Sequence, residues 1–167
     1  MKGKAIVTAA LTGDLMETLY FEDFRPGDSF ESPGITLTEA AIIDFAMRFD
    51  PQPFHMDNEA AKESIYGRLV ASGIHTLAIT FRSLLLKGVL TGNLGSPGFD
   101  ELRWLRPVYP GDTLRAAAEV IEVRPSSTRP DRGTVRFQCT TLNQRNEPVQ
   151  TIICNQLLKR RPAETES

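Results

Sequence analysis

The hydrophobic pattern of the chain changes its period near residue 99, and this change restricts the fold more than any other feature. Before it, the segment SGIHTLAITFRSLLLKG carries an apolar stripe at helical spacing, made by Ile74, Leu77, Ala78, Phe81 and Leu85. Further apolar residues cover its other faces, so we expect a helix over 72–88 that is buried on most sides. After residue 99, apolar and polar residues alternate as in strands.

The alternating runs are four, and turn-forming stretches separate them. They centre on residues 102–104, 114–120, 135–139 and 149–158, with turns at 110–112, 124–133 and 143–148. Helices come first and antiparallel strands follow, which indicates an α+β fold. One long apolar helix before several long strands suggests an antiparallel sheet wrapped around that helix.

Shorter helices are predicted ahead of the long one. Thr38 can cap a helix over EAAIIDFAMRF, and its apolar face consists of Ile42, Phe45, Ala46 and Phe49. Asp57 or Asn58 can cap a short helix over NEAAKES. Ser72 can cap the long helix and Gly88 can end it.

Length and composition fit one globular domain. The 167 residues are 41% hydrophobic and 24% charged, which is ordinary for a folded protein. We place a single domain at 20–161, with an N-terminal extension at 1–19 and a C-terminal tail at 162–167. The extension has Lys2 and Lys4 before an apolar run, but the run is interrupted by Thr8 and lacks a convincing cleavage pattern for a signal peptide.

Charge and cysteine usage exclude several classes of partner. A formal net charge of −2 argues against a nucleic-acid partner. No stretch approaches the roughly 20 apolar residues that cross a bilayer, so we expect no membrane partner. Cys139 and Cys154 lie in alternating runs without CxxC spacing, so we interpret them as buried free thiols in a cytoplasmic protein and predict no metal site.

The stretch FDPQPFHMD, residues 49–57, concentrates chemistry in nine positions. Asp50 and His55 are five residues apart, and Pro51 and Pro53 remove amide donors and favour extended backbone before each proline. We therefore predict a stiff loop. Such a loop is either a simple connector between helices or a preorganised acid/base pair, and the residues alone leave both interpretations open.

Four segments of the chain resemble one known family. FEDFRPGD, DPQPFH, GRLVASGIHT and RPVYPGDTL are similar to segments of the MaoC-like acyl dehydratases, which are relatives of the (R)-specific enoyl-CoA hydratases. The resemblance runs from about Tyr20 to Arg161, and the DPQPFH and ASG stretches are its most specific parts. It implies the hot-dog fold, in which an antiparallel sheet wraps around a long central helix.

The resemblance also implies a set of site residues. Asp50 and His55 match the catalytic pair of the family loop, Asp-any-Asn-Pro-any-His, while Gln52 stands where the family has Asn. Ser72-Gly73 replaces a frequent His-Gly pair, and the Gly73 amide would be the oxyanion donor at a helix N-terminus. Gln52, Ser72, Gly73 and His75 are the expected substrate-binding residues. For His75, a polar position near the pocket mouth or in the core is favoured over catalysis.

By this resemblance, the protein is a lyase that hydrates a 2-enoyl-CoA or dehydrates a 3-hydroxyacyl-CoA. The substrate is an acyl-CoA thioester, and no separate cofactor is expected because CoA is part of the substrate. An exposed sheet edge predicts a homodimer or a higher homo-oligomer. Two alternatives remain open: a hot-dog acyl-CoA thioesterase, and a non-catalytic acyl-CoA-binding subunit. Trp104 is interpreted first as a core residue and Arg106 as a solvated strand residue.

Overall fold

The computed structural model describes residues 18–162. Most of the proposed extension and tail therefore lies outside the described residues. A short 3₁₀ helix over Phe21–Asp23 opens this part of the chain. The remaining elements are β1 Ser29–Glu31, β2 Ile35–Thr36, α1 Glu39–Phe49, α2 Pro53–Met56, α3 Asn58–Lys62, α4 Gly73–Leu86, β3 Asn93–Trp104, β4 Thr113–Pro125, β5 Arg132–Leu142 and β6 Pro148–Lys159.

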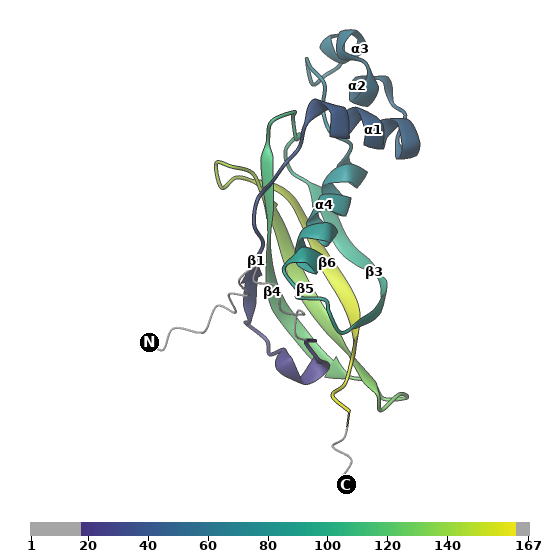
Figure 1. Cartoon of the computed structure of the whole chain (residues 1–167), viewed down its shortest axis with the longest axis vertical. Helices are drawn as coiled ribbons and strands as arrows, with labels where there is room; N and C mark the ends of the chain where they lie inside the picture. Colours follow the sequence, from purple (N-terminus) through teal and green to yellow (C-terminus); the bar gives the residue numbers. More distant parts are fainter. Residues whose placement is uncertain (1–17, 163–167) are drawn as a thin grey trace.

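The strands form one antiparallel sheet around the long helix. Their order is β1-β4-β5-β6-β3, and β2 pairs with β4 beside this path. Figure 1 shows α4 lying along one face of the sheet, with α1, α2 and α3 gathered at one end. The predicted α+β class is confirmed, and β3 is an edge strand of this sheet.

The main core lies between the inner face of the sheet and α4. Strand β5 alternates strictly between buried and partly exposed residues, so one face of it points to the core. Phe137 in this strand is fully buried, and Phe24 packs edge-on against it at 5.6 Å between ring centroids. A second cluster, which includes Ile42 of α1 and Leu114 of β4, fills the end of the sheet beneath the small helices.

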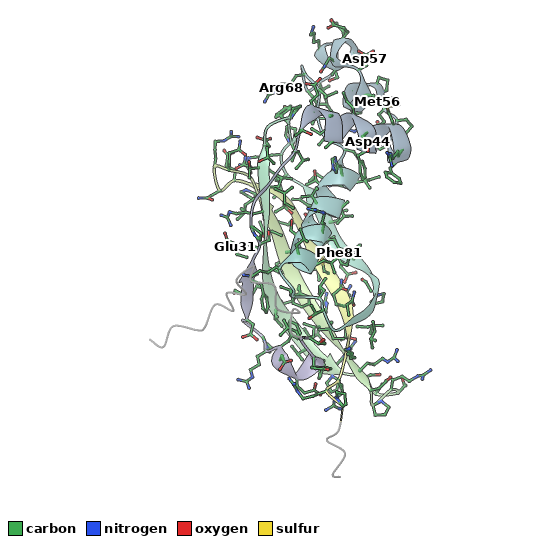
Figure 2. The ribbon with its side chains drawn as sticks, in the orientation of Figure 1. Glu31, Asp44, Met56, Asp57, Arg68 and Phe81 are labelled. Carbon is green, nitrogen blue, oxygen red and sulfur yellow. The ribbon has the colours of Figure 1, made fainter. Side chains whose placement is uncertain are left out.

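The long helix α4 is less buried than predicted, because Ile74, Leu85 and Leu86 are exposed. Its most buried residues are His75, Thr76, Thr80, Ser83 and Leu84. Part of the apolar stripe faces outward, since Ile74 is 47% exposed and Leu85 is 42% exposed, whereas Leu77 and Phe81 pack against the main core. Phe81, also in this stripe, is only partly buried and is labelled in Figure 2. The sheet presents Thr141 and Gln150 as hydrogen-bond partners to Thr80 on the inner face of α4. Helical periodicity therefore located the apolar stripe but did not predict which side of the helix packs against the sheet.

Three smaller predictions also need correction. The expected loop over 49–57 contains the helical turn α2, because a proline at the first helical position, here Pro53, loses no hydrogen bond. Phe49, expected on the buried face of α1, is 65% exposed. Strand β3 begins at Asn93 rather than near residue 99, since Gly95, Pro97 and Gly98 hide the alternation.

Several sequence-based predictions are confirmed. Thr38 caps α1, Asp57 caps α3 and Ser72 caps α4, each through a side-chain oxygen that accepts a backbone N–H. Cys139 and Cys154 are buried free thiols, and their sulfur atoms lie 3.6 Å apart across β5 and β6. A separate observation, which tests none of these predictions, is that none of the helices within residues 18–162 is long and apolar enough to cross a membrane.

Candidate active site

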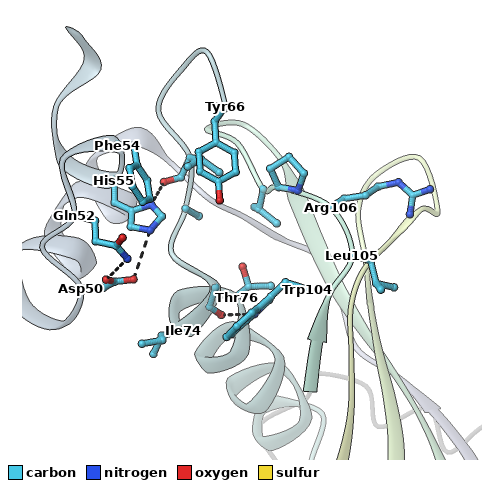
Figure 3. A pocket seen from close by; sticks show the side chains of 15 residues that line it. Asp50, Gln52, Phe54, His55, Tyr66, Ile74, Thr76, Trp104, Leu105 and Arg106 are labelled. Carbon is cyan, nitrogen blue, oxygen red and sulfur yellow. Dashed lines mark hydrogen bonds and ion pairs between the residues drawn. The ribbon is translucent and has the colours of Figure 1, made fainter. Parts of the chain in front are cut away.

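The backbone after α1 brings Asp50 and His55 together. Asp50 is the last residue to donate into α1, through its N–H to the Ala46 carbonyl, and Pro51 cannot continue the helix. The Gln52 N–H then donates to the Asp50 carbonyl at 2.7 Å, which turns the chain into α2. As a result, His55 Nε2 lies 3.5 Å from Asp50 Oδ2, as Figure 3 shows.

The hydrogen bond of the other ring nitrogen fixes the tautomer of His55. Nδ1 lies 2.7 Å from the Val70 carbonyl oxygen, and a carbonyl oxygen only accepts. Nδ1 therefore carries the proton, which leaves Nε2 of the neutral ring as an acceptor facing Asp50. The side chain is buried and is held in this orientation by the edge of Phe54 at 4.5 Å between centroids.

Two donors hold the side chain of Asp50. The Ser72 hydroxyl donates to Oδ2 at 2.6 Å, and the Gln52 amide donates to Oδ1 at 2.8 Å. The Ser72 hydrogen bond, with smaller help from Gln52 and His55, holds the pKa of Asp50 below its ordinary value of 3.8. Asp50 is therefore a carboxylate at neutral pH and offers an acceptor toward Nε2 of His55.

The same serine connects the pair to the N-terminus of α4. Its hydroxyl oxygen accepts from the Ile74 N–H at 3.1 Å while its hydrogen goes to Asp50. The next residue, Gly73, begins the helix, where backbone N–H groups are unsatisfied and the helix dipole is positive. Within the described part of the chain, nothing accepts a hydrogen bond from the Gly73 amide.

These groups face a pocket of about 530 Å³. Its lining includes Asp50, Gln52, Phe54, His55, Tyr66, Gly73, Ile74, Thr76, Trp104 and Arg106. Figure 3 shows Asp50, Gln52 and His55 on one side of it and Trp104 beside the first turn of α4 on the other. The pocket thus combines two adjacent acceptors with a helix N-terminus, between walls that include aromatic rings.

Comparison with known proteins identifies the family. Residues 22–142 match the family model described as MaoC like domain. The chain belongs to this MaoC-like family. The solved MaoC-like dehydratase of Rhodospirillum rubrum is 46% identical to this MaoC-like domain, with a TM-score of 0.81, and the match covers 86% of this chain and 99% of that one.

Other relatives of this MaoC-like domain extend the comparison. Uncharacterized protein YdeM of Bacillus subtilis is 30% identical over 129 residues, which are 77% of this chain and 90% of YdeM. Mesaconyl-CoA hydratase of Cereibacter sphaeroides is 46% identical over 52 residues, 31% of this chain and 15% of that enzyme. A Mycobacterium tuberculosis protein with a double hot-dog fold superimposes with a TM-score of 0.71 at 20% identity, covering 90% of this chain and 47% of that one, which confirms the hot-dog fold.

Only two of the four expected substrate-binding residues of this MaoC-like domain line the pocket. Gln52 and Gly73 line the pocket. Ser72 is buried behind it, between Asp50 and the helix. His75 lies outside the lining and stacks on Phe45 at 4.4 Å. Burial lowers the pKa of His75, and its Nδ1 has no hydrogen-bond partner among residues 18–162.

Sequence reasoning missed several lining residues of this MaoC-like domain. Trp104 is 53% exposed rather than part of the core, and Arg106 lies on the pocket wall. Pro107 was the available signal, because a proline has no N–H to donate to a strand ladder and often follows the end of a strand. In the structure β3 ends at Trp104, and residues 104–108 line the pocket. Tyr66, near the turn residue Gly67, carried no comparable signal.

Proposed function

We propose that this protein reversibly hydrates a 2-enoyl-CoA, or equally dehydrates a 3-hydroxyacyl-CoA. One observation carries the proposal: Asp50 Oδ2 and His55 Nε2 are two acceptors 3.5 Å apart, in a pocket that also contains the N-terminus of α4. A water molecule can donate one hydrogen to each acceptor. A thioester carbonyl can accept from the Gly73 amide in the same pocket.

The chemistry follows from these roles. The water oxygen attacks C3 of the enoyl thioester while the Asp50–His55 pair takes one of its protons. The electrons of the C2–C3 double bond move toward the thioester oxygen, where the Gly73 amide and the dipole of α4 stabilise the developing negative charge. The pair then returns a proton to C2, so the net change is addition of one water. Dehydration is the same sequence in reverse.

Two features of the pocket suit a CoA thioester. The Arg106 guanidinium belongs to the pocket wall and donates to the Pro148 carbonyl at 2.7 Å, which leaves other N–H groups for phosphate oxygens. Phe54 and Tyr66 supply apolar wall, with ring centroids 5.5 Å apart.

The free buried thiols Cys139 and Cys154 fit a reducing compartment, so we place the reaction in the cytoplasm.

We also propose that the protein works as a homodimer. The exposed part of the α4 stripe continues onto the edge strand through Phe81, whose ring packs edge-on against Phe99 at 6.3 Å between centroids. We call Ile74, Ala78, Phe81, Leu85 and Phe99 the α4–β3 face. A contiguous apolar surface beside a sheet edge is suited to a self-complementary contact. In the proposed homodimer, the same face of a second copy of the chain covers the α4–β3 face.

Incubation with a short 2-enoyl-CoA tests the proposed activity. Hydration removes the enoyl-thioester absorbance and yields a 3-hydroxyacyl-CoA, which mass spectrometry detects as a gain of one water. Appearance of free CoA thiol would indicate a thioesterase instead. Saturable binding without either product would indicate a non-catalytic acyl-CoA-binding subunit. Asp50→Asn is the matched control, because it keeps the shape of the side chain and removes its charge.

A further inference from the structure

A buried chain of hydrogen bonds runs beneath the pocket and ends at Gly73. Thr80 and Thr141 are 1% exposed and Gln150 is 0% exposed. Thr141 Oγ1 lies 2.5 Å from Thr80 Oγ1, and the Gln150 amide nitrogen donates to Thr80 Oγ1 at 3.1 Å. The Trp104 indole N–H donates both to Gln150 Oε1 and to the Gly73 carbonyl, each at 3.0 Å. The chain joins α4 to β5, β6 and β3.

Only one direction of hydrogen bonding satisfies every group in this chain. An indole N–H only donates, so the oxygen of Gln150 must face Trp104 and its NH₂ must face Thr80. The Thr80 hydroxyl donates to the Thr76 carbonyl at 2.8 Å, so it accepts from both Gln150 and Thr141. Gln150 therefore has to accept from the Trp104 indole with its oxygen and donate to the Thr80 hydroxyl with its NH₂ group.

Trp104 lies directly against Gly73. A Cβ atom placed on Gly73 would lie 2.5 Å from indole Cε2 and 2.8 Å from Cδ2, so the ring occupies the place of a side chain. On its other side, Gly73 follows Ser72, which is bonded to Asp50. The first residue of α4 is thus fixed between the Asp50–Ser72 hydrogen bond and the indole.

We propose that Trp104, oriented by Gln150 and Thr80, is a positioning residue that holds the Gly73 amide in line with the thioester oxygen. This inference rests on the proposed function. The Gln150–Thr80–Thr141 chain fixes the ring plane, and the indole N–H fixes the Gly73 carbonyl. Without the chain, the ring rotates and the first peptide of α4 loses its support. An oxyanion donor acts only at a defined position, so small displacements lower the rate strongly.

Two buried glutamines on β6 make a matched test. Gln150 and Gln156 are both 0% exposed, but Gln156 has no hydrogen-bond partner among the described residues for either polar atom. For Gln150→Met we expect kcat with a short 2-enoyl-CoA to fall about 10- to 100-fold with little change in KM, because the lost contact acts in the transition state. Gln156→Met should leave kcat unchanged.

The fluorescence of the protein reports on the same contact without turnover. Trp104 is the only tryptophan of the chain. Gln150→Met should shift its emission and lower its anisotropy, and Gln156→Met should change neither. Thr80→Val should reproduce the effects of Gln150→Met on kcat and fluorescence. Thr80→Ser keeps the hydroxyl, so its kcat and tryptophan emission should match those of the wild type. Melting curves establish that each variant is folded at the assay temperature.

The outcomes separate this inference from the proposed function. Equal kcat values for Gln150→Met and Gln156→Met, with an active wild type, would overturn the positioning role and leave the hydratase proposal intact. An unaltered Trp104 emission in Gln150→Met would do the same. If the wild type hydrates no enoyl-CoA, the proposed function fails and the positioning role fails with it.

Discussion

At the scale of single residues, the site depends on hydrogen bonds that select the tautomer of His55 and lower the pKa of Asp50. Val70 selects the tautomer of His55, and Ser72 and Gln52 hold Asp50 as a carboxylate. Gln52, which departs from the family pattern, reaches Asp50 with its longer arm. Gln52 therefore acts as a hydrogen-bond donor to the Asp50 carboxylate. A contact between Gln52 and the substrate stays a prediction.

Ser72→Ala tests the electrostatic role of Ser72. Hydrogen bonding keeps the folded-state pKa of Asp50 below 3.8, so it adds stability above pH 3.8 that is lost as the pH falls through the lowered value. Removing the hydroxyl raises this pKa. We expect the acid limb of the pH–rate profile to move to higher pH, and the loss of the cap to cost about 1 kcal/mol of stability.

Ser72→Thr is the matched control, because it keeps a hydroxyl for both Asp50 and the Ile74 N–H. Its pH–rate profile should follow that of the wild type. An unmoved acid limb in Ser72→Ala would show that the hydroxyl does not set the pKa of Asp50.

At the scale of elements, periodicity and caps predicted most of the fold. Strong alternation located β4, β5 and β6, and capping residues located the starts of α1, α3 and α4. The side of α4 that meets the sheet could not be predicted, because its partners Thr141 and Gln150 are brought to it only by the fold. The resemblance to the family loop predicted that Asp50 and His55 belong to one site, and both line the pocket. Trp104 could not be predicted as a pocket residue, because only the fold shows that the end of β3 reaches the pocket.

The packing of β3 on α4 also makes a prediction about Gly73. A methyl group at this position overlaps the indole of Trp104, which must then leave the helix terminus. We expect Gly73→Ala to shift the tryptophan emission and to reduce turnover by about 10²-fold, comparable to the loss of an oxyanion donor. Unchanged emission would mean that Trp104 does not rest on Gly73.

At the scale of the whole molecule, the exposed residues Ile74, Leu85 and Phe99 leave apolar surface on the α4–β3 face, which is the proposed dimer contact. The α4–β3 face lies beside the pocket, since Ile74 belongs to both. A partner bound there would exclude water from one side of the site. Assembly and catalysis are therefore expected to be connected.

Substitution of Phe99 tests the proposed dimer. Phe99 is 43% exposed on edge strand β3, and Ile121 is 40% exposed on β4, on the other side of β5 and β6 in the sheet order. We expect Phe99→Glu to place a charge in the contact and give a monomer near 18.5 kDa by light scattering. Ile121→Glu should remain at twice this mass. Equal masses for both variants would exclude the α4–β3 face as the interface.

Turnover of an enoyl-CoA by Asp50→Asn, His55→Ala and the double variant tests whether the two side chains activate one water molecule together. If both side chains hold one water, each single change should lower kcat by ~10² to 10⁴. The double variant should then be scarcely slower than the poorer single variant, because either change removes the same unit. Small rate losses, together with additive decreases in melting temperature, would instead mean that Asp50 and His55 only connect and pack the helices.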